Sequence, residues 1–169
     1  GDGRKPVILF VGGKWAWKQW DPGRFALLAG HLAGRFPVVV CGGAGDEETL
    51  EKVRSKERTG SKTITYLCVD NLQQLASVIG QGAVLVTTDT VAVHVATAVG
   101  TRAVVLFGPT DPRRVLPEDT PHTVLFKGLS CQPCYSVRDG KEECSRSIPG
   151  FCLRSISVEE VAAEVQALA

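Results

Sequence analysis

The sequence has no excess of charge of either sign and no long hydrophobic run. Its 169 residues include 19 basic and 18 acidic side chains, which gives a formal net charge of +1. Charges balanced in this way form no broad positive surface, so nucleic acid is not an expected partner. No apolar run approaches the roughly 20 residues that cross a bilayer, and residues 1–6 lack the apolar stretch of a signal peptide. We therefore expect a cytoplasmic protein without a membrane span.

Several motifs of nucleotide binding and hydrolysis are also missing. The sequence contains neither GxGxxG nor GxxxxGKS/T, which argues against dinucleotide-binding and P-loop proteins. It contains no GxSxG, no HExxH and no paired-carboxylate motif, so it shows no self-contained hydrolytic machinery. Two of the three histidines, His31 and His122, belong to no motif.

Hydrophobic periodicity predicts a single α/β domain over residues 1–169. Short apolar runs, several of them rich in valine, alternate with helical patterns. Strands are expected at 7–11, 38–41, 64–68, 84–86, 103–107 and 123–126, and helices at 22–35, 46–56, 72–79, 90–99 and from 157 onward. The helix at 90–99 is apolar almost all round and should be buried. This alternation predicts a Rossmann-like parallel sheet of about six strands, with helices on both faces.

Ligands of such sheets bind outside the carboxyl ends of the strands, and the turn at 87–92 is the strongest candidate. A helix that begins at Thr90 would direct its free N–H groups at a phosphate. Asp89 would repel a phosphate unless it caps the helix or orients a hydroxyl or a lysine. The alternative is that Asp89 or Thr90 is simply an N-cap. Further N-caps are expected at Asp21, at Asp70 with Gln73, and at Ser157 with Glu160.

Two other turns carry weaker signals. Residues 42–45 (GGAG) would let the backbone approach a ligand, and Glu47 could accept two ribose hydroxyls, although a surface carboxylate is the commoner explanation for such a residue. All three tryptophans fall in residues 14–20 (KWAWKQW), which suits contact with a ligand or another domain. The alternative places Trp20 under the first helix. His94 is expected to be either a hydrogen-bonded core residue or a functional one.

Six cysteines divide into two groups. Cys41 and Cys68 each end an apolar run and are expected to pack as small hydrophobic residues. The others lie in an irregular loop insertion at 128–156, before the last helix, with the spacing C-x2-C-x9-C-x7-C: Cys131, Cys134, Cys144 and Cys152. Four such thiolates could hold zinc or an iron–sulfur cluster; reduced thiols and disulfides are the alternatives.

Five segments, in order along the chain, resemble the ADP-heptose:lipopolysaccharide heptosyltransferases of glycosyltransferase family 9. The two most specific are DTVAVHVATA from Asp89 to Ala98 and FGPTDP from Phe107 to Pro112. The others are KQW at 18–20, GAGDE at 43–47 and the leucines at 72 and 75. The resemblance covers essentially the whole chain but only the C-terminal, donor-binding half of a GT-B enzyme, so the N-terminal domain would be absent.

The resemblance implies roles for the turns near the expected nucleotide. Lys18 would meet the donor's diphosphate as a point charge. Glu47 would accept ribose hydroxyls, and Asp70 with Asn71 would lie beside the adenine. The FGPTDP segment would close the wall of the crevice.

The resemblance also implies roles for the helix that follows the fourth strand. Asp89 and Thr90, with the N–H groups of Val91 and Ala92, would bind the sugar-diphosphate end of the donor. His94 would support this helix from behind. One residue departs from the family pattern, because a glycine usually follows the DT pair and Val91 stands there. A valine disfavours positive φ and crowds the approach of a ligand to the backbone, which bears on donor affinity and identity.

The family transfers heptose from ADP-heptose to a sugar of the lipopolysaccharide inner core, with inversion and without a required cofactor. Such a reaction needs a general base and charge stabilisation for the leaving diphosphate. The base in the family is an aspartate of the N-terminal domain, so no catalytic residue is expected here and the domain alone should be inactive. The lipopolysaccharide acceptor would be reached through that domain, with peripheral association at the inner-membrane face. The alternative is a stand-alone, non-enzymatic Rossmann module that binds a nucleotide or a protein, with or without a structural metal.

Overall fold

The computed structural model describes residues 3–117, 120–135, 144 and 146–169. The strands are β1 (Val7–Phe10), β2 (Val38–Gly43), β3 (Ile64–Val69), β4 (Val84–Thr88), β5 (Ala103–Phe107) and β6 (Thr123–Phe126). The helices are α1 (Pro22–Leu32), α2 (Glu47–Lys56), α3 (Leu72–Gly80), α4 (Val91–Val99), α5 (Phe151–Arg154) and α6 (Val158–Leu168), with 3₁₀ turns η1 (Ala16–Lys18) and η2 (Pro112–Arg114).

The six strands form one parallel sheet in the order β3-β2-β1-β4-β5-β6. In register, Leu9 of β1 lies beside Val40 of β2 on one side and Val86 of β4 on the other. The predicted Rossmann-like sheet is therefore confirmed. Its strand order reverses between β1 and β4, and the crevice at such a reversal is where doubly wound sheets bind ligands.

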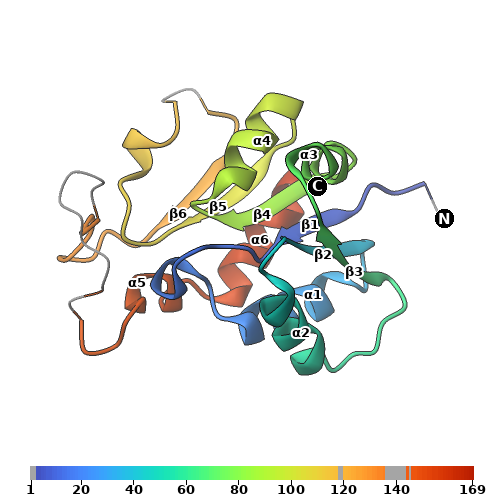
Figure 1. Ribbon diagram of the computed structural model, residues 1–169, viewed down its shortest axis with the longest axis horizontal. Coiled ribbons are helices and arrows are strands. Elements are labelled where there is room, and N and C mark those ends of the chain that lie inside the picture. The colour runs from blue at the N-terminus through green and yellow to red at the C-terminus, as the bar shows by residue number, and fades with distance from the viewer. Residues whose placement is uncertain (1–2, 118–119, 136–143, 145) are drawn as a thin grey trace.

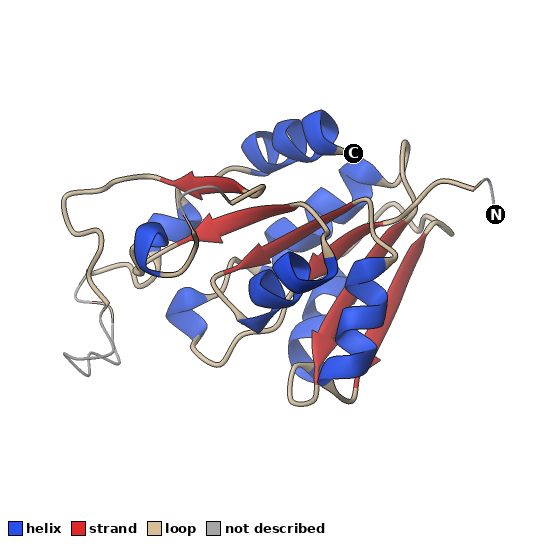
Figure 2. Cartoon of the chain, turned by 90° about the horizontal axis from the view of Figure 1, so that it is seen from above, coloured by secondary structure: helices blue, strands red, loops and turns tan. Residues whose placement is uncertain are grey.

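Helices cover both faces of the sheet (Figures 1 and 2). Alternate residues of β1 pack into different cores. Val7 and Leu9 pack into a core with α1, α2 and α6, whereas Ile8 and Phe10 pack into a core with α3 and α4. All four β1 side chains are buried, because a central strand of a parallel sheet has helices on both sides. Burial of this strand fixes the turn that follows it at the ligand-binding edge.

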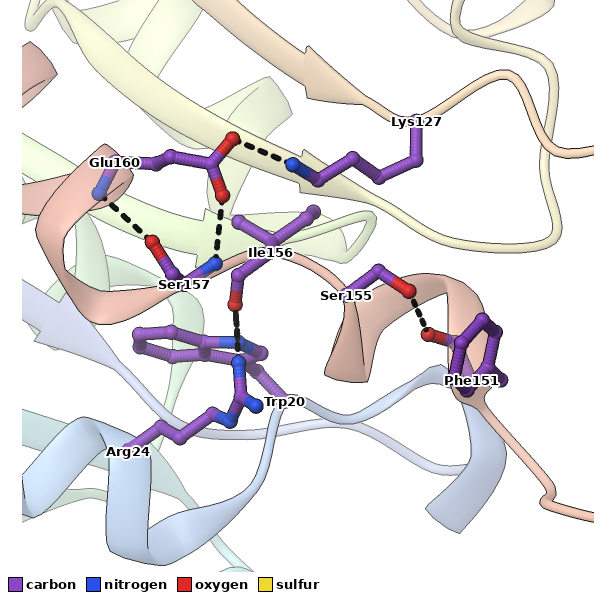
Figure 3. A network of polar contacts seen from close by, with 8 residues as sticks. All are labelled: Trp20, Arg24, Lys127, Phe151, Ser155, Ile156, Ser157 and Glu160. Carbon is purple, nitrogen blue, oxygen red and sulfur yellow. Dashed lines mark hydrogen bonds and ion pairs between the residues drawn. The ribbon is translucent and has the colours of Figure 1, made fainter.

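The N-caps of α1 and α6 are confirmed. The Asp21 carboxylate accepts the Gly23 N–H, and Ser157 and Glu160 form a complete capping box. Glu160 also pairs with Lys127, just after β6 (Figure 3). This box fixes the start of the last helix against the sixth strand.

The predicted capping box of α3 at Asp70 and Gln73 is wrong by one residue. The N-cap is Asn71, whose side-chain oxygen accepts the Gln74 N–H at 2.9 Å. Gln74 in turn accepts the Asp70 N–H at 2.9 Å. The shift releases the Asp70 carboxylate from helix capping.

Two further expectations differ from the structure. The helix α4 is not buried all round: Ala92, Val93, Val95 and Ala96 face the core, but Val91 is 51% exposed and Val99 is 40% exposed. It lies on one face of the sheet beside α3, so only one side of it is covered. The loop insertion at 128–156 contains the short helix α5, which sequence periodicity misses because it has only four residues.

The carbonyl of Ile156, just before α6, links that part of the chain to the region where α1 begins. It accepts the Trp20 indole N–H at 3.2 Å and a second hydrogen bond from the Arg24 guanidinium (Figure 3). Trp20 is 1% exposed and its ring meets that of Phe25 edge-on. For Trp20, the alternative that placed it beneath the first helix is therefore confirmed.

Candidate functional site

An open pocket of about 700 Å³ lies at the strand-order reversal. It is lined by Phe10 at the end of β1 and by parts of four turns: 13–18, 43–46, 69–72 and 89–91. These turns follow β1, β2, β3 and β4, so the pocket lies where the carboxyl ends of the strands meet. Of the residues predicted from sequence, it brings together Lys18, Asp70, Asp89, Thr90 and Val91.

Lys18 and Asp89 form an ion pair inside this pocket. Lys18 Nζ lies 3.8 Å from Asp89 Oδ2, and each side chain is only 16% exposed. Burial lowers the pKa of Lys18, and the neighbouring Asp89 carboxylate opposes that change. Asp89 therefore orients a lysine, which is one of the roles that make a carboxylate compatible with a phosphate site.

Thr90, rather than Asp89, is the N-cap of α4. Its Oγ1 accepts the Ala92 N–H at 3.3 Å, and its carbonyl accepts the Val93 N–H at 3.2 Å. Within the described part of the chain, this leaves the Val91 N–H as the donor at the helix start that a ligand could take. Ala92 itself is buried, and its N–H is already used.

Val91 occupies the position where the family pattern has glycine, and the backbone accommodates it. No non-glycine residue in the described ranges has a positive φ, so Val91 adopts an ordinary helical conformation. Its half-exposed side chain lines the pocket beside Thr90. The effect of this valine on a ligand is therefore steric and does not come from a strained backbone.

Asp46 holds the pocket wall together, a role that sequence reasoning missed. Its carboxylate accepts the Gly43 N–H at 2.8 Å and the Gly13 N–H at 3.4 Å, which ties the turn after β2 to the turn after β1. A Cβ on Gly12 would come within 2.3 Å of this carboxylate, so only glycine fits there. The signals in the sequence are the glycine pair at 12–13 and the glycines at 42, 43 and 45 that come just before this acidic residue.

Glu47 lies outside the main pocket, in a smaller neighbouring groove with Tyr66 and Cys68. Its carboxylate accepts the Gly45 N–H at 3.1 Å, and hydrogen bonds from its own and the Gly45 backbone N–H lower its pKa. Glu47 is therefore engaged by its own turn. A ribose in the main pocket would have to draw it away from Gly45.

The other predicted residues fall at the edges of the site. Asp70 and Asn71 line the pocket where α3 begins. His94 is exposed on α4, so the interpretation as a core histidine is wrong for it. The buried, hydrogen-bonded histidine is His122, which contacts Thr97 Oγ1 at 2.8 Å. The carbonyls of Gly108 and Pro109, in the FGPTDP segment, accept hydrogen bonds from residues 132–135.

Residues 14–20, the tryptophan loop, contribute side chains both to the core and to the pocket. Trp20 is buried in the core, while Trp15 lines the pocket beside Lys14. The rings of Trp15 and Trp17 meet edge-on at 6.0 Å, and both contact Tyr135, at 6.1 and 5.8 Å. Sequence reasoning missed Tyr135, because it lies more than 100 residues from the loop that it contacts.

Residues 2–144 match the sequence model of the family described as glycosyltransferase family 9 (heptosyltransferase). The chain belongs to glycosyltransferase family 9.

Known family 9 relatives and structures of the same fold are longer than this chain. Lipooligosaccharide heptosyltransferase 2 of Haemophilus influenzae is 28% identical over 131 residues, which are 73% of this chain and 37% of that protein. The structure of E. coli ADP-heptose lipopolysaccharide heptosyltransferase II superposes with a TM-score of 0.78 at 23% identity, over 99% of this chain and 47% of that one. The chain thus spans less than half the length of either protein.

A third structure shares the fold of this family 9 chain. The iron-containing dodecameric glycosyltransferase TibC of enterotoxigenic E. coli shares the fold, with a TM-score of 0.72 at 14% identity over 99% of this chain and 47% of TibC. All six cysteines of the present chain lie in its described residues, and none forms a disulfide. Burial raises the pKa of Cys152, with smaller contributions from the nearby Cys134 and Cys144.

The four late cysteines of this family 9 chain do not form a metal centre as they stand. Within the described ranges, no three histidine, cysteine or acidic side chains are grouped closely enough to hold an ion. Cys131 instead accepts a hydrogen bond from Arg146 Nε at 3.2 Å. Zinc or an iron–sulfur cluster at Cys131, Cys134, Cys144 and Cys152 therefore stays a prediction.

Membrane association was the remaining expectation for this family 9 chain. Among the helices that the structure describes, none is both long enough and apolar enough to cross a bilayer.

Proposed function

We propose that this chain is the donor-binding half of an inverting heptosyltransferase, and that its pocket binds ADP-heptose or a related nucleotide-sugar. The observation that carries the proposal is the Lys18 ammonium, held at 3.8 Å from Asp89 in the pocket where α4 begins. A cation and a helix N-terminus at one strand-order reversal suit a diphosphate. Family membership supports the reaction class, and the names of the relatives support the donor.

The diphosphate is the part of the donor that these residues address best. As the bond between the sugar and the diphosphate breaks, negative charge grows on the leaving group, and a fixed cation stabilises that charge. Lys18 supplies the cation, while the Val91 N–H supplies a donor at the positive end of α4, where Thr90 is the N-cap. In this proposal the charge is met by the chain's own groups and by no metal ion.

The nucleoside is assigned to the other end of the pocket. Asp70 and Asn71 lie where α3 begins and would flank the adenine. The ribose would lie near the turn after β2. Glu47 would contact it only after its carboxylate leaves the Gly45 N–H, so its role as the ribose acceptor stays a prediction.

The acceptor and the general base are assigned to a second domain. None of the three pocket carboxylates is proposed as the base, because Asp89 is paired with Lys18, Asp46 accepts the Gly43 and Gly13 N–H groups, and Asp70 is assigned to the adenine end. We therefore place the base and the lipopolysaccharide core sugar on the part of the enzyme that the longer relatives have and this chain does not span. The 169 residues alone should bind donor but transfer no sugar.

Titration calorimetry with ADP and with adenosine tests the proposal. The wild-type chain should bind ADP, and Lys18→Ala should weaken ADP binding about tenfold, the loss of one charged hydrogen bond. Adenosine carries no phosphate, so its affinity should not change in Lys18→Ala. Lys62→Ala, which removes an exposed lysine before β3, is the matched control and should bind ADP like the wild type.

Two results would contradict the proposal. The first is a wild-type chain that binds neither ADP nor an ADP-sugar. The second is an equal loss of ADP and adenosine affinity in Lys18→Ala, which would mean that the lysine supports the fold and not the phosphates.

A further inference from the structure

Three side chains lie near the Lys18 ammonium: Asp89, Tyr135 and, farther away, Trp17, whose ring centroid is 6.0 Å distant. Asp89 Oδ2 lies 3.8 Å away, and the centroid of the Tyr135 ring lies 3.6 Å away. A cation within about 6 Å of an aromatic ring is attracted by the negative face of that ring. The ring therefore replaces part of the water that Lys18 loses in a pocket where only 16% of its side chain is exposed.

Tyr135 is held over Lys18 by two tryptophans. Its ring meets Trp15 and Trp17 at 6.1 and 5.8 Å, with interplanar angles of 61° and 65°. Trp15 and Trp17 meet each other at 6.0 Å with nearly perpendicular planes, so the three rings form one aromatic cluster. Edge-on pairs of this kind restrict the angle at which each ring can sit. The face of Tyr135 is thereby directed at the lysine.

Backbone hydrogen bonds bring Tyr135 to this position. The N–H groups of Cys134 and Tyr135 both donate to the carbonyl of Pro109, at 2.9 and 3.0 Å. One step earlier in the chain, Gln132 Nε2 donates to the carbonyl of Gly108 at 2.6 Å. The Gly108–Pro109 backbone, which follows β5, thus anchors the start of the cysteine-rich segment beside the tryptophan loop.

The far end of the cysteine-rich segment meets the same loop. Gly150, with φ +69°, lies so close to Trp17 that a Cβ would come within 3.2 Å of the Trp17 carbonyl oxygen. Cys152 approaches Gly108, where an added Cβ would lie 3.4 Å from its sulfur. Both ends of the segment therefore pack around the turn that carries Lys18, and Tyr135 is the side chain that reaches the ammonium.

We propose that Tyr135 is a positioning residue for the diphosphate of the donor, because its ring holds the Lys18 ammonium in the pocket. The inference rests on the proposed function, since it assigns Lys18 to the phosphates. The ring keeps its attraction for the ammonium when Lys18 leaves Asp89 for an incoming diphosphate. Tyr135, in the described first part of the cysteine-rich segment, is then part of the donor site, although none of the four late cysteines lines the pocket.

A double-mutant cycle read by calorimetry tests this role. Tyr135→Leu removes the ring and should weaken ADP binding about three- to tenfold, while Tyr135→Phe keeps the ring and should bind like the wild type. Adenosine affinity should be unchanged in both variants. In a Lys18→Ala background, Tyr135→Leu should cause no further loss, because the group that it positions is gone.

A matched control separates positioning from general packing. Phe36 also lies beside a cation, with Arg35 at 5.9 Å from its ring, but it is outside the pocket. Phe36→Leu should therefore leave ADP affinity unchanged. A Tyr135→Leu loss that persists in the Lys18→Ala background, or that extends equally to adenosine, would overturn the inference, as would no loss at all.

A readout that needs no ligand distinguishes the two proposals. In the wild type, the ε-methylene protons of Lys18 should show an upfield ring-current shift by NMR, and Tyr135→Leu should abolish it. If the wild type binds no ADP, the proposed function fails, whether or not this shift is present. If ADP binds and Lys18→Ala weakens it, but the shift is absent from the wild type, only the role of Tyr135 fails.

Discussion

His122 Nδ1 accepts the backbone N–H of Ala103 at 3.1 Å. The ring is buried, and burial lowers its pKa below the ordinary value of 6.5. A protonated ring could not accept this hydrogen bond. The unfolded chain therefore takes up the proton first as pH falls, and the stabilisation by neutral His122 is complete above about pH 6.5 and lost at lower pH.

Urea unfolding from pH 7.5 to 5 measures this effect. His122→Gln should lower the free energy of unfolding at pH 7.5 by about 1–3 kcal/mol and flatten the pH dependence below 6.5. His31→Gln, which changes an exposed histidine of α1, should keep the wild-type pH profile. An unchanged profile in His122→Gln would contradict the argument.

Replacing Val91 should change ADP affinity only through the volume that its side chain occupies in the pocket. Val91→Gly removes a half-exposed side chain beside the free N–H of the helix start and should tighten ADP binding about threefold. The same change should cost roughly 0.5–1 kcal/mol of stability, because glycine is a poor helix former. Calorimetry and urea unfolding measure the two effects. Val91→Ala should bind ADP with an affinity between those of the wild type and Val91→Gly. Weaker ADP binding by a folded Val91→Gly would contradict the steric explanation.

The Asp46 carboxylate should be needed for the shape of the pocket. Asp46→Asn exchanges one acceptor oxygen for a donor that faces a backbone N–H, at Gly43 or at Gly13. The free energy of unfolding should fall by about 1–2 kcal/mol, and ADP should bind more weakly. Glu48→Gln on the exposed face of α2 is the matched control. Equal stability of Asp46→Asn and wild type would show that the turns need no such bridge.

The six cysteines should differ in their reaction with iodoacetamide at pH 8. Burial, with a smaller effect of Asp46, raises the pKa of Cys41 to about 12, so its thiol stays protonated and covered. Cys131 is partly exposed and should be alkylated first. Peptide mass spectrometry gives the order of modification, with urea-unfolded protein as the reference. Early alkylation of Cys41 in native protein would mean that its strand opens.

Metal analysis decides the prediction for the cysteine-rich segment. If the four late thiolates bind zinc or an iron–sulfur cluster, anaerobically purified protein should contain metal that Cys131→Ser and Cys134→Ser each remove. Cys41→Ser, in the core of β2, should retain it. A colourless, metal-free wild type with all four late thiols open to alkylation would leave them as reduced thiols.

The centre of the sheet was predictable because strands β1, β4 and β5 are buried on both faces. Val7–Phe10, Val84–Thr88 and Ala103–Phe107 are continuous apolar or β-branched runs, a pattern that few other structures produce. Asp89 was found because it directly follows a buried strand, whereas the role of Lys18 was predicted from the resemblance to the family. Their pairing at 3.8 Å then follows from topology.

The features that sequence reasoning missed depend on contacts between distant segments. In the sequence, Asp46 looks only like the start of a helix. Its bridging role is hidden because its partners Gly13 and Gly43 belong to turns that follow different strands. Tyr135 reaches Lys18 only because the Pro109 carbonyl holds its backbone. The exposure of His94 depends on which side of α4 has a neighbour, and periodicity cannot show this for a helix that is apolar almost all round.

The hydrogen bond from Trp20 to Ile156 has a consequence for synthesis on the ribosome. Its two residues are 136 positions apart, and at 5–20 residues per second the partner emerges roughly 7–27 s later. Until then α1 has no α6 beside it, and the apolar surface that the two helices share is open to solvent. The packing of the first βα unit is therefore complete only after the last helix is made. During that interval the exposed apolar surface of α1 is a binding site for a chaperone.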